Sequence, residues 1–552
     1  MRYCRRLPLV FFAVGVVTAI AYTVYHHGIS ATALRHYFTK PVISLFSDTS
    51  NLQMTAAKPA VIIVGSGLAG LSAAHEALKA GAEVHMLDRA PKPGGNSIKA
   101  SSGINGAGTR FQAAANVIAV DDDDVSGFYD DTVRSAGARL QTQTQTQTAA
   151  GLGAAERKAL IELMTAQSAD AVHWLADDVG VDLSVVAQLG GHSAPRTHRG
   201  ASGPPPGAAI VGALLKRLGA DPKFKLTTSA TVEALTLSGG DDGDGKVSVS
   251  GVRYTLDGQT HELRGPVVFA VGGFAGDAHG LLAKHRPDLA GVPSTNDARP
   301  GSHGLLDEVG AEFVDMDSVQ IHPTGFVDPK DPAASYKFLA AEALRGEGGI
   351  LLSSRGERFV DEMEKRDVVS EAIMTLPPSQ LVSAAGNEGV RQWDVTLLLD
   401  PGASEACASH LGFYLFKGLM QKKKVKDLPP ALIEAIDKYA AAVAAGSDKA
   451  FGRKTYGHWR LPAGDANREE EVSIGTVTPV THFTMGGVAF NTQSQVLGRR
   501  GHSLAPINGV WAAGEITGGI HGDNRLGGSS LLECVIFGRI AGTEAAKSLS
   551  TV

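Results

Sequence analysis

The stretch 60-AVIIVGSGLAG-70 decides the fold class of this chain. Its first five residues are a short apolar run of the kind found in buried parallel strands. A helix-like run, 71-LSAAHEALKAG-81, follows the glycines, and a second apolar run, 83-EVHML-87, ends beside Asp88. A strand, a G-x-G-x-x-G turn, a helix, a second strand and an acidic residue in this order predict a Rossmann-like unit that binds a dinucleotide.

Each glycine of this turn has its own expected task. Gly65 allows the tight turn, Gly67 lets the backbone approach a pyrophosphate, and Gly70 lets the helix pack closely on the strand. The pyrophosphate is expected at the N-terminus of the helix, where free N–H groups and the helix dipole favour negative charge. We expect Asp88 to accept hydrogen bonds from the ribose hydroxyls.

Three further glycine-rich segments favour FAD as the dinucleotide. Residues 94–108 (GGNSIKASSGINGAG) form a second loop soon after Asp88, and residues 267–274 (VVFAVGGF) and 509–519 (GVWAAGEITGG) have the pattern of strands that end in glycines. Such strand ends, spread over the whole chain, suit a long cofactor bound lengthwise, and Glu515 is expected to bond its ribityl chain. The predicted cofactor contacts are Gly65, Gly67, Leu68, Ala69, Gly70, Asp88, Arg89, Gly95, Asn96, Ser97, Ser102, Gly103, Ala270, Gly272, Gly273, Glu515, Ser530 and Leu531.

Composition excludes several other classes of protein. The net charge of −6 over 552 residues suggests no affinity for nucleic acid. The three cysteines, Cys4, Cys407 and Cys534, are too far apart for a disulfide framework, and the chain has neither a C-x-x-C-H haem motif nor a cysteine cluster for iron–sulfur. We predict no metal site, so redox chemistry must use the flavin or a partner.

The N-terminus predicts a targeting or anchoring segment. Arg2, Arg5 and Arg6 precede an uncharged, largely apolar stretch over residues 7–25, and the first acidic residue is Asp48. This pattern fits a signal anchor, a long signal peptide or a mitochondrial presequence with a membrane span. A buried core helix is the less favoured alternative, because the polar linker over residues 47–58 detaches the segment. We therefore expect localisation to the mitochondrion or the endoplasmic reticulum, with membrane contact only through this segment.

The pattern of elements predicts an α/β protein with an inserted domain. Residues 1–50 are the signal or anchor segment and linker, and residues 59–316 are the first part of a Rossmann-like FAD-binding domain. Between residues 317 and 483 the glycine–strand pattern lapses and helical stretches appear, which indicates an inserted α+β domain. Residues 484–548 complete the FAD-binding domain.

One charged run within the insert raises a specific question. The stretch 342-EALRGEGGILLSSRGERFVDEMEKRD-367 contains four arginines and seven acidic residues. Charged runs usually face water, so an ordinary solvated surface is one interpretation. The other is a path along which protons move.

Several longer motifs resemble one family closely. They are 320-QIHPT-324, 341-AEALRGEGGILL-352, 356-GERFVDE-362 with Arg366 and Asp367, 482-HFTMGG-487, and 521-HGDNRLGGSSLLECVIFGR-539. The chain resembles, over about residues 59–548, the flavoprotein subunits of fumarate reductases and succinate dehydrogenases, and most of all the soluble, single-chain fumarate reductases. The resemblance implies a flavin domain with a mobile capping domain, and hydride transfer from reduced flavin to fumarate.

The resemblance also assigns roles to residues. His322, His482 and Arg525 match substrate-binding positions, Arg366 matches the proton donor, and Glu342 and Arg345 match the relay that reprotonates it. Fumarate is a planar dianion, so guanidinium and imidazole donors at both ends suit it. Within the charged run, Glu342, Arg345 and Arg366 are then expected to point inward, and Glu347, Arg355, Glu357 and Glu364 to be solvated.

Three positions depart from the family. Asn96 stands where membrane-bound relatives attach FAD covalently through a histidine, so the FAD is expected to be noncovalent. Ala341 replaces a threonine that contacts substrate in the bacterial soluble enzymes, and 298-ARPGSHG-304 replaces a T-G-D-G segment. In 190-GGHSAPRTHRG-200, Arg196, His198 and Arg199 either line the substrate entrance or cover the cap.

Other functions stay open at this point. The same fold could reduce another activated alkene acid, of the urocanate or acrylate type, although arginine and histidine at both ends of the site favour a dicarboxylate. A succinate dehydrogenase subunit or an L-aspartate oxidase is a third alternative, and a membrane-anchored flavin-binding protein without turnover is a fourth. The electron donor, NADH or free reduced flavin, is left undecided by the sequence.

Overall fold

The computed structural model describes residues 60–115, 123–142, 151–239, 247–379 and 389–550. The chain divides into two compact units, residues 1–58 and 59–552, and all described residues belong to the second. The predicted targeting segment therefore lies outside the described residues. None of the helices formed by the described residues has the length and apolar character needed to cross a membrane.

A parallel sheet forms the centre of the described unit, with strand order β6-β2-β1-β10-β20 and with β8 and β7 continuing it. β1 is buried along its whole length and pairs in parallel with β2 on one side and β10 on the other. The predicted Rossmann-like unit is confirmed. The strands are β1 (Val61–Val64), β2 (Val84–Leu87), β6 (Phe224–Thr227), β7 (Thr231–Gly239), β8 (Val247–Leu256), β9 (Gln259–Arg264), β10 (Val267–Phe269), β19 (Gln495–Arg500) and β20 (Ser503–Ala512).

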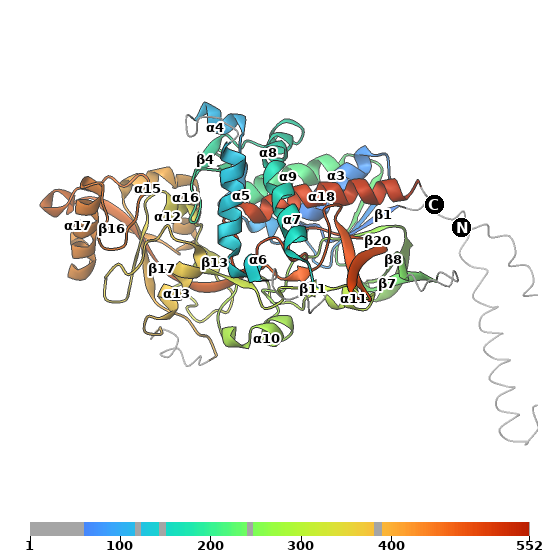
Figure 1. Cartoon of the computed structure of the whole chain (residues 1–552). Coiled ribbons are helices and arrows are strands. Elements are labelled where there is room, and N and C mark those ends of the chain that lie inside the picture. The colour runs from blue at the N-terminus through green and yellow to red at the C-terminus, as the bar shows by residue number, and fades with distance from the viewer. Residues whose placement is uncertain (1–59, 116–122, 143–150, 240–246, 380–388, 551–552) are drawn as a thin grey trace, which may run out of the picture. The chain divides into compact units, whose positions relative to one another are not determined.

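Two helices from opposite ends of the described chain lie side by side on one face of this sheet (Figure 1). They are α3 (Leu68–Lys79) and α18 (Ser529–Ser548). A Cβ atom added at Gly538 or Gly542 of α18 would lie 2.4 or 2.1 Å from a backbone oxygen of α3. The glycines therefore allow backbone-to-backbone packing, which brings the last helix against the first one after the dinucleotide turn.

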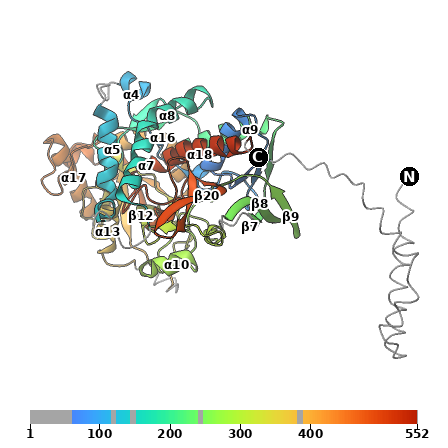
Figure 2. The same cartoon turned by 45° about the vertical axis from the view of Figure 1, so that its right-hand side comes forward.

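Helices from residues 110–219 cover the same region, and Figure 2 shows α5, α7 and α8 grouped near α18. They are α4 (Arg110–Ala114), α5 (Asp123–Ala136), α6 (Ala138–Thr142), α7 (Ala154–Ala166), α8 (Ser168–Asp177) and α9 (Pro206–Gly219). A small sheet of order β3-β5-β4 follows the glycine-rich loop of residues 94–103. Its strands are β3 (Ile104–Asn105), β4 (Val185–Ala187) and β5 (Thr197–Arg199).

A second large sheet has the order β13-β12-β17-β15-β14, and β16 also pairs with β17. Its strands are β12 (Val319–Phe326), β13 (Phe338–Leu339), β14 (Ile350–Leu352), β15 (Val395–Leu399), β16 (Gln421–Lys424) and β17 (Glu471–Thr484). The helices around it are α12 (Ala343–Gly346), α13 (Arg366–Met374), α15 (Pro401–Ala406), α16 (Ala408–Lys417) and α17 (Pro430–Ala444). This sheet has its own buried apolar clusters, and it lies within the predicted insert apart from the last residue of β17.

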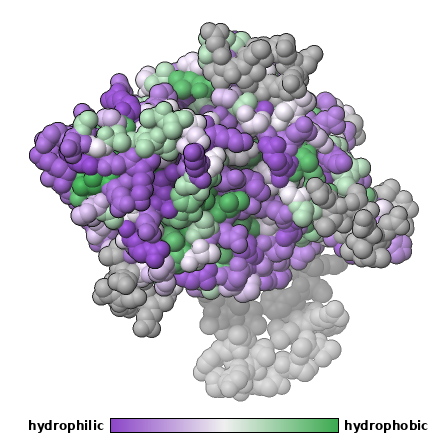
Figure 3. Space-filling model, turned by 60° about the vertical axis from the view of Figure 1, so that its left-hand side comes forward, coloured by the Kyte–Doolittle hydropathy of each residue, from purple (hydrophilic) through white to green (hydrophobic). Residues whose placement is uncertain are grey.

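The remaining elements of the described residues are short. They are α10 (Leu281–His285), α11 (Gly304–Asp307), the antiparallel pair β11 (Phe313–Val314) and β18 (Gly487–Val488), and 3₁₀ turns at Ser97–Lys99, Pro287–Leu289, Val425–Asp427 and Gly464–Asn467. The face drawn in Figure 3 is largely hydrophilic and is broken by small apolar patches. That mixture is usual for the surface of a globular protein.

Candidate active site

A cavity of about 580 Å³ lies at the carboxyl ends of β1, β2 and β10. This is the edge at which open α/β sheets bind their ligands. The cavity extends from Asp88 at one end to Arg366, His482 and Arg525 at the other. Every predicted cofactor contact except Gly70 lies in its wall.

The glycine turn shapes the first part of the cavity. Gly65 has φ +106°, and a Cβ there would lie 2.3 Å from the backbone oxygen of Ala270, so only glycine fits between β1 and β10. A Cβ at Gly70 would lie 2.0 Å from the oxygen of Gly65, so Gly70 supports the turn from behind. Helix α3 begins after Gly67, which makes no side-chain cap, and the first N–H of the helix, that of Leu68, donates to the hydroxyl of Ser97 at 3.0 Å. The N-terminal end of the helix lines the cavity, where its dipole favours a phosphate.

Asp88 holds this turn as well as lining the cavity. Its carboxylate accepts the backbone N–H of Ser66 at 2.8 Å and that of Ala90 at 2.8 Å, together with the Ser66 hydroxyl. A carboxylate has about four lone-pair positions, so capacity remains for a ribose hydroxyl. The neighbouring Arg89 donates to the carbonyl of Pro300 at 2.8 Å. This bond attaches residues 298–304, the segment that differs from the family pattern, to the cavity wall.

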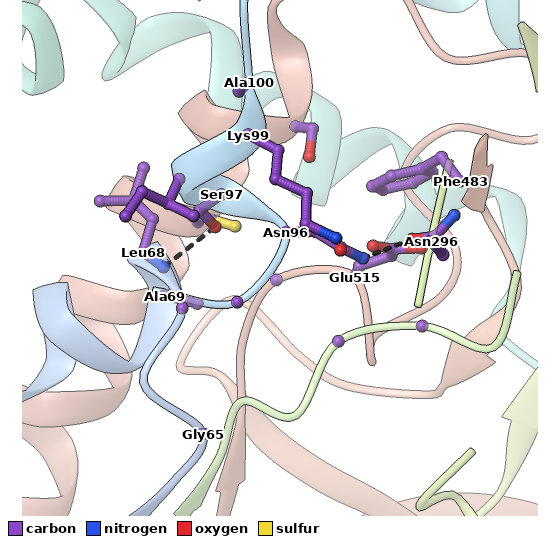
Figure 4. A pocket seen from close by; sticks show the side chains of 18 of the residues that line it. Gly65, Leu68, Ala69, Asn96, Ser97, Lys99, Ala100, Asn296, Phe483 and Glu515 are labelled. Atoms are coloured by element: carbon purple, nitrogen blue, oxygen red, sulfur yellow. Dashed lines mark hydrogen bonds between the residues drawn. The ribbon is translucent and has the colours of Figure 1, made fainter. Parts of the chain in front are cut away.

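Asn96 lies in the cavity wall and bonds across it, as Figure 4 shows. Its Nδ2 donates to Oδ1 of Asn296, and the Nδ2 of Asn296 donates to the backbone oxygen of His482 at 3.0 Å. The Oδ1 of Asn96 is buried and has no partner among the described residues. An orphaned amide oxygen beside a long glycine-walled cavity fits a bound FAD, and an amide offers no ring nitrogen for a covalent bond to it.

Glu515 is the one carboxylate of the wall with a raised pKa. Burial raises the pKa of Glu515 to about 7, and the nearby carboxylate of Glu533 adds to the effect. Its Oε1 accepts the backbone N–H of Thr484 at 3.0 Å. A Cβ at Gly273 would lie 2.3 Å from that same oxygen. Glu515 is thus fixed in place, poised between its charged and neutral forms near neutral pH.

Two histidines on adjacent antiparallel strands lie at the far end of the cavity; His482 lines its wall, whereas His322 lies beside His482 and outside the lining. His322 lies on β12 and His482 on β17, and their ring centroids are 5.3 Å apart. Burial, with the positive charges of Arg366 and other groups, holds both histidine pKa values well below their usual range. Both rings are therefore neutral at physiological pH. Nδ1 of His322 contacts both the backbone N–H of Thr324, at 3.2 Å, and the backbone oxygen of Thr324, at 3.1 Å.

Arg525 lies between these histidines and the C-terminal helix. Its guanidinium stacks over the ring of Phe483, 4.3 Å from the centroid, and donates to the backbone oxygen of Leu526 at 3.1 Å. Burial and the adjacent charge of Arg366 lower the pKa of Arg525 to about 9. Its Nε is buried and has no partner within the described part of the chain. Among the described residues no carboxylate forms a close ion pair with Arg525, although Glu533 and Glu515 act on it from a greater distance.

Arg366 is held by a short ion pair. Its Nε donates to Oε2 of Glu342 at 2.7 Å, and its second terminal nitrogen lies 2.5 Å from the same oxygen. The remaining terminal nitrogen donates to Oε1 of Gln320 at 2.8 Å. Burial raises the pKa of Glu342, but Arg366 and Arg345 outweigh that effect, so the pKa lies below its ordinary value and the carboxylate is ionised.

Arg345 is the third member of the expected proton relay, and it does not contact Glu342 directly. Its guanidinium lies 3.9 Å from Oε1 of Glu342, too far for a hydrogen bond, and it donates to the backbone oxygen of Glu362 at 2.5 Å. Its side chain is only 1% exposed, and two of its nitrogens have no partner among the described residues. Burial lowers the pKa of Arg345, although Glu342 opposes the shift and Arg366 adds to it.

The charged run thus divides as predicted at six of seven positions. Glu342, Arg345 and Arg366 are buried, whereas Arg355, Glu357 and Glu364 are exposed. The prediction for Glu347 was wrong. That residue is buried because its carboxylate pairs with Arg199 at 2.5 Å and with His458 at 2.8 Å, two partners distant in sequence.

The arginines and the histidine of the 190–200 segment bond to other side chains of the protein. Arg196 pairs with Asp131 at 2.6 Å, and His198 bonds the hydroxyl of Thr109 at 2.7 Å. Arg196, His198 and Arg199 are all buried, and none of them lines the cavity, so they do not form a substrate entrance.

Ala341 stands where the bacterial soluble enzymes have a threonine. Its backbone N–H donates to the hydroxyl of Tyr414 at 3.1 Å, and Tyr414 itself lines the cavity.

Two residues that position the site were not predicted. Gln320 accepts from Arg366 and donates to the backbone oxygen of Arg525 at 2.7 Å, so one side chain links the guanidinium of Arg366 to the backbone of Arg525. The backbone N–H of Gly190 donates to Oε1 of Glu342 at 2.9 Å across 152 residues of sequence. Gln320 could have been found as a member of the QIHPT motif, whereas no local signal indicates Gly190.

Comparisons with known proteins agree with this geometry. Residues 60–531 match the family described as "FAD binding domain". The chain is 38% identical over 524 residues to the "Fumarate reductase" of Schizosaccharomyces pombe, covering 92% of this chain and 93% of that protein. It is 39% identical to "Fumarate reductase 1" of Saccharomyces cerevisiae, covering 87% and 97%. A solved structure of the open conformation of a flavocytochrome c3 fumarate reductase shares 30% identity with a TM-score of 0.64, covering 89% of this chain and 78% of that one.

Proposed function

Because the chain belongs to the FAD-binding domain family, we propose that it is an FAD-dependent fumarate reductase that produces succinate. One observation carries the proposal. At the end of a glycine-walled cavity, two buried guanidinium groups and two neutral histidines converge, and a carboxylate stands behind only one of the guanidinium groups. This arrangement suits a dianion that is to be reduced and protonated.

Recognition rests on Arg525 together with the histidines. Arg525 is a buried cation whose Nε lacks a partner within the described residues, so a substrate carboxylate would satisfy both its charge and its hydrogen bonding. Withdrawal of charge from that carboxylate makes the alkene more electrophilic, which stabilises the negative charge that develops during reduction. Reduced FAD supplies the hydride when it is bound.

Protonation of the second alkene carbon falls to Arg366. An arginine is a poor acid because its reference pKa is about 12.5, so it must regain its proton immediately. Glu342 is ionised and contacts Arg366 directly, and it can accept a proton and pass it on. Arg345 stands next, and the 3.9 Å separation from Glu342 requires a small side-chain movement or one bridging water.

The same residues bear on the alternatives. A monocarboxylate such as acrylate, or a substrate with an imidazole ring such as urocanate, would leave part of this paired set without an anion. A flavin-binding protein without turnover would have no use for a buried Arg366–Glu342 pair, which is costly to bury. We propose that FAD is noncovalent and that NADH or free reduced flavin supplies the electrons.

The test is to reduce the purified holoprotein anaerobically and to add fumarate, urocanate, acrylate and succinate separately while following flavin absorbance. Rapid reoxidation by fumarate and not by urocanate or acrylate is expected. Reoxidation by urocanate alone would identify a different alkene acid as substrate. Absence of reoxidation by every acid would contradict the proposed activity.

We further propose that residues 1–50 direct the protein to the mitochondrion or the endoplasmic reticulum, with membrane contact only through that segment. The arginine-rich, acid-free start and the apolar stretch over residues 7–25 support this. Deletion of residues 1–50 is expected to leave an active protein in the cytosol. A full-length protein that fractionates with the cytosol would contradict the proposal.

A further inference from the structure

A hydroxyl group lies directly behind one of the two substrate-facing histidines. Oγ1 of Thr295 is 2.9 Å from Nδ1 of His482. Thr295 is only 8% exposed, and both residues line the cavity. The other ring nitrogen of His482, Nε2, has no protein partner in the part of the chain that the structure describes, so it is the nitrogen left for a ligand.

The position of this hydroxyl is fixed by its surroundings. The backbone N–H of Thr295 donates to the oxygen of Thr481 at 3.1 Å, and Asn296 donates to the oxygen of His482 at 3.0 Å. The neighbouring Ser294 hydroxyl adds a bond to the same Thr481 oxygen at 3.2 Å. The segment that carries Thr295 is thus attached to the strand that carries the ring, at Thr481 and at His482 itself.

The second histidine has a different set of contacts. Nδ1 of His322 lies 3.2 Å from the backbone nitrogen of Thr324 and 3.1 Å from the backbone oxygen of the same residue. A donor and an acceptor therefore stand beside this nitrogen, and either neutral form of the ring is satisfied there. The Nε2 of that ring is buried without a partner among the described residues.

We propose that Thr295 is a positioning residue that donates its hydroxyl proton to His482 and so fixes the Nε2–H form of that ring. The inference rests on the proposed dicarboxylate substrate. A neutral imidazole has one N–H and one lone pair. With the proton on Nδ1, the lone pair on Nε2 would face the substrate carboxylate and repel it. With the proton on Nε2, His482 offers a donor to the dianion without carrying charge.

Thr295→Val removes the hydroxyl while keeping the shape of the side chain. The Michaelis constant for fumarate is expected to rise about ten- to hundredfold, because a hydrogen bond to a charged group contributes about 1.5–3 kcal/mol and each 1.4 kcal/mol is tenfold. The turnover number should change much less, since Arg366 and Glu342 are untouched. Thr295→Ser keeps the hydroxyl and should remain within about threefold of the parent.

A matched control removes a different hydroxyl, that of Thr481 on the strand that carries His482. Thr481 is buried beside His482, but its Oγ1 donates to the oxygen of Ala275 at 3.1 Å and does not contact the ring. Thr481→Val should lower thermal stability and leave the Michaelis constant unchanged. If Thr481→Val and Thr295→Val raise the Michaelis constant equally, the role of Thr295 is only structural and the proposal is wrong.

Nitrogen-15 NMR of histidine-labelled holoprotein with succinate reads the tautomer directly, and His482→Gln identifies the signal by its loss. The parent should show the proton on Nε2 of His482, and Thr295→Val should show a mixture of the two forms. A proton on Nδ1 in the parent, or a Michaelis constant within threefold of the parent in Thr295→Val, overturns the proposal. A parent that is not reoxidised by fumarate refutes the activity instead, while the NMR result still decides the tautomer.

Discussion

Replacing Arg366 by lysine separates a proton path from a charged surface. Arg366 is buried and makes three contacts through its guanidinium fork, two with Glu342 at 2.7 and 2.5 Å and one with Gln320 at 2.8 Å. A lysine has a single compact ammonium group that cannot reproduce this fork. Loss of a positioned acid costs about 10² to 10⁴ in rate, or about 2.7–5.4 kcal/mol in barrier. We expect the upper end, because the proton relay behind Arg366 is lost as well.

Arg355→Lys is the control, eleven positions earlier in the same run. The Arg355 side chain is 77% exposed, and its ion pair with Glu357, at 3.3 Å, lies at the surface, where such pairs contribute little. The assay is anaerobic oxidation of reduced holoprotein by fumarate, with flavin absorbance of each variant showing that FAD stays bound. Rates within about threefold of the parent for both variants, less than about 1 kcal/mol in barrier, would refute the mechanism assigned to this run.

Three further outcomes follow from the site. Acid precipitation should leave the yellow colour in the supernatant, because Asn96 cannot attach FAD covalently; colour retained in the pellet would contradict this. The Michaelis constant for fumarate should be constant between about pH 6 and 8 and should rise above about pH 9, because Arg525 has its pKa lowered to about 9 and loses its positive charge as the pH rises through that value; a constant value up to pH 10 would count against it. Gly65→Ala should abolish flavin retention, measured as absorbance per mole of protein, because its Cβ would lie 2.3 Å from the oxygen of Ala270, whereas Gly258→Ala, with nothing within 4 Å, should retain FAD.

Local patterns predicted the parts of the fold whose causes are local. The apolar run, the glycine turn and the helix of residues 60–79 became β1 and α3 because strand burial, turn geometry and helix packing are all encoded within about twenty residues. The inward and outward positions of the charged run followed from matched motifs and not from periodicity. Glu347 shows the limit of that reasoning, since its burial depends on Arg199 and His458, each more than 100 residues away.

The same limit applies to the groups that hold the site residues in position. The bond from the Gly190 N–H to Glu342 and the bond from Gln320 to Arg525 span 152 and 205 residues. Both join elements whose approach is decided by tertiary packing. Sequence motifs can identify which side chains do chemistry, but the groups that hold them in place come from wherever the fold brings a donor or an acceptor.

The packing of α18 on α3 has a consequence for the timing of cofactor acquisition. The cavity uses the turn after β1, near the start of the described chain, and Ser530 and Leu531 at the start of the last helix. β10 also pairs in parallel with β20, in which Ala512 stands opposite Phe269, 243 residues earlier in the chain. During synthesis the N-terminal half therefore cannot close the cavity by itself. A ribosome-bound chain would have no finished place for FAD, so flavin loading must follow completion of the polypeptide, and a frameshift near the C-terminus would remove the cofactor together with the helix.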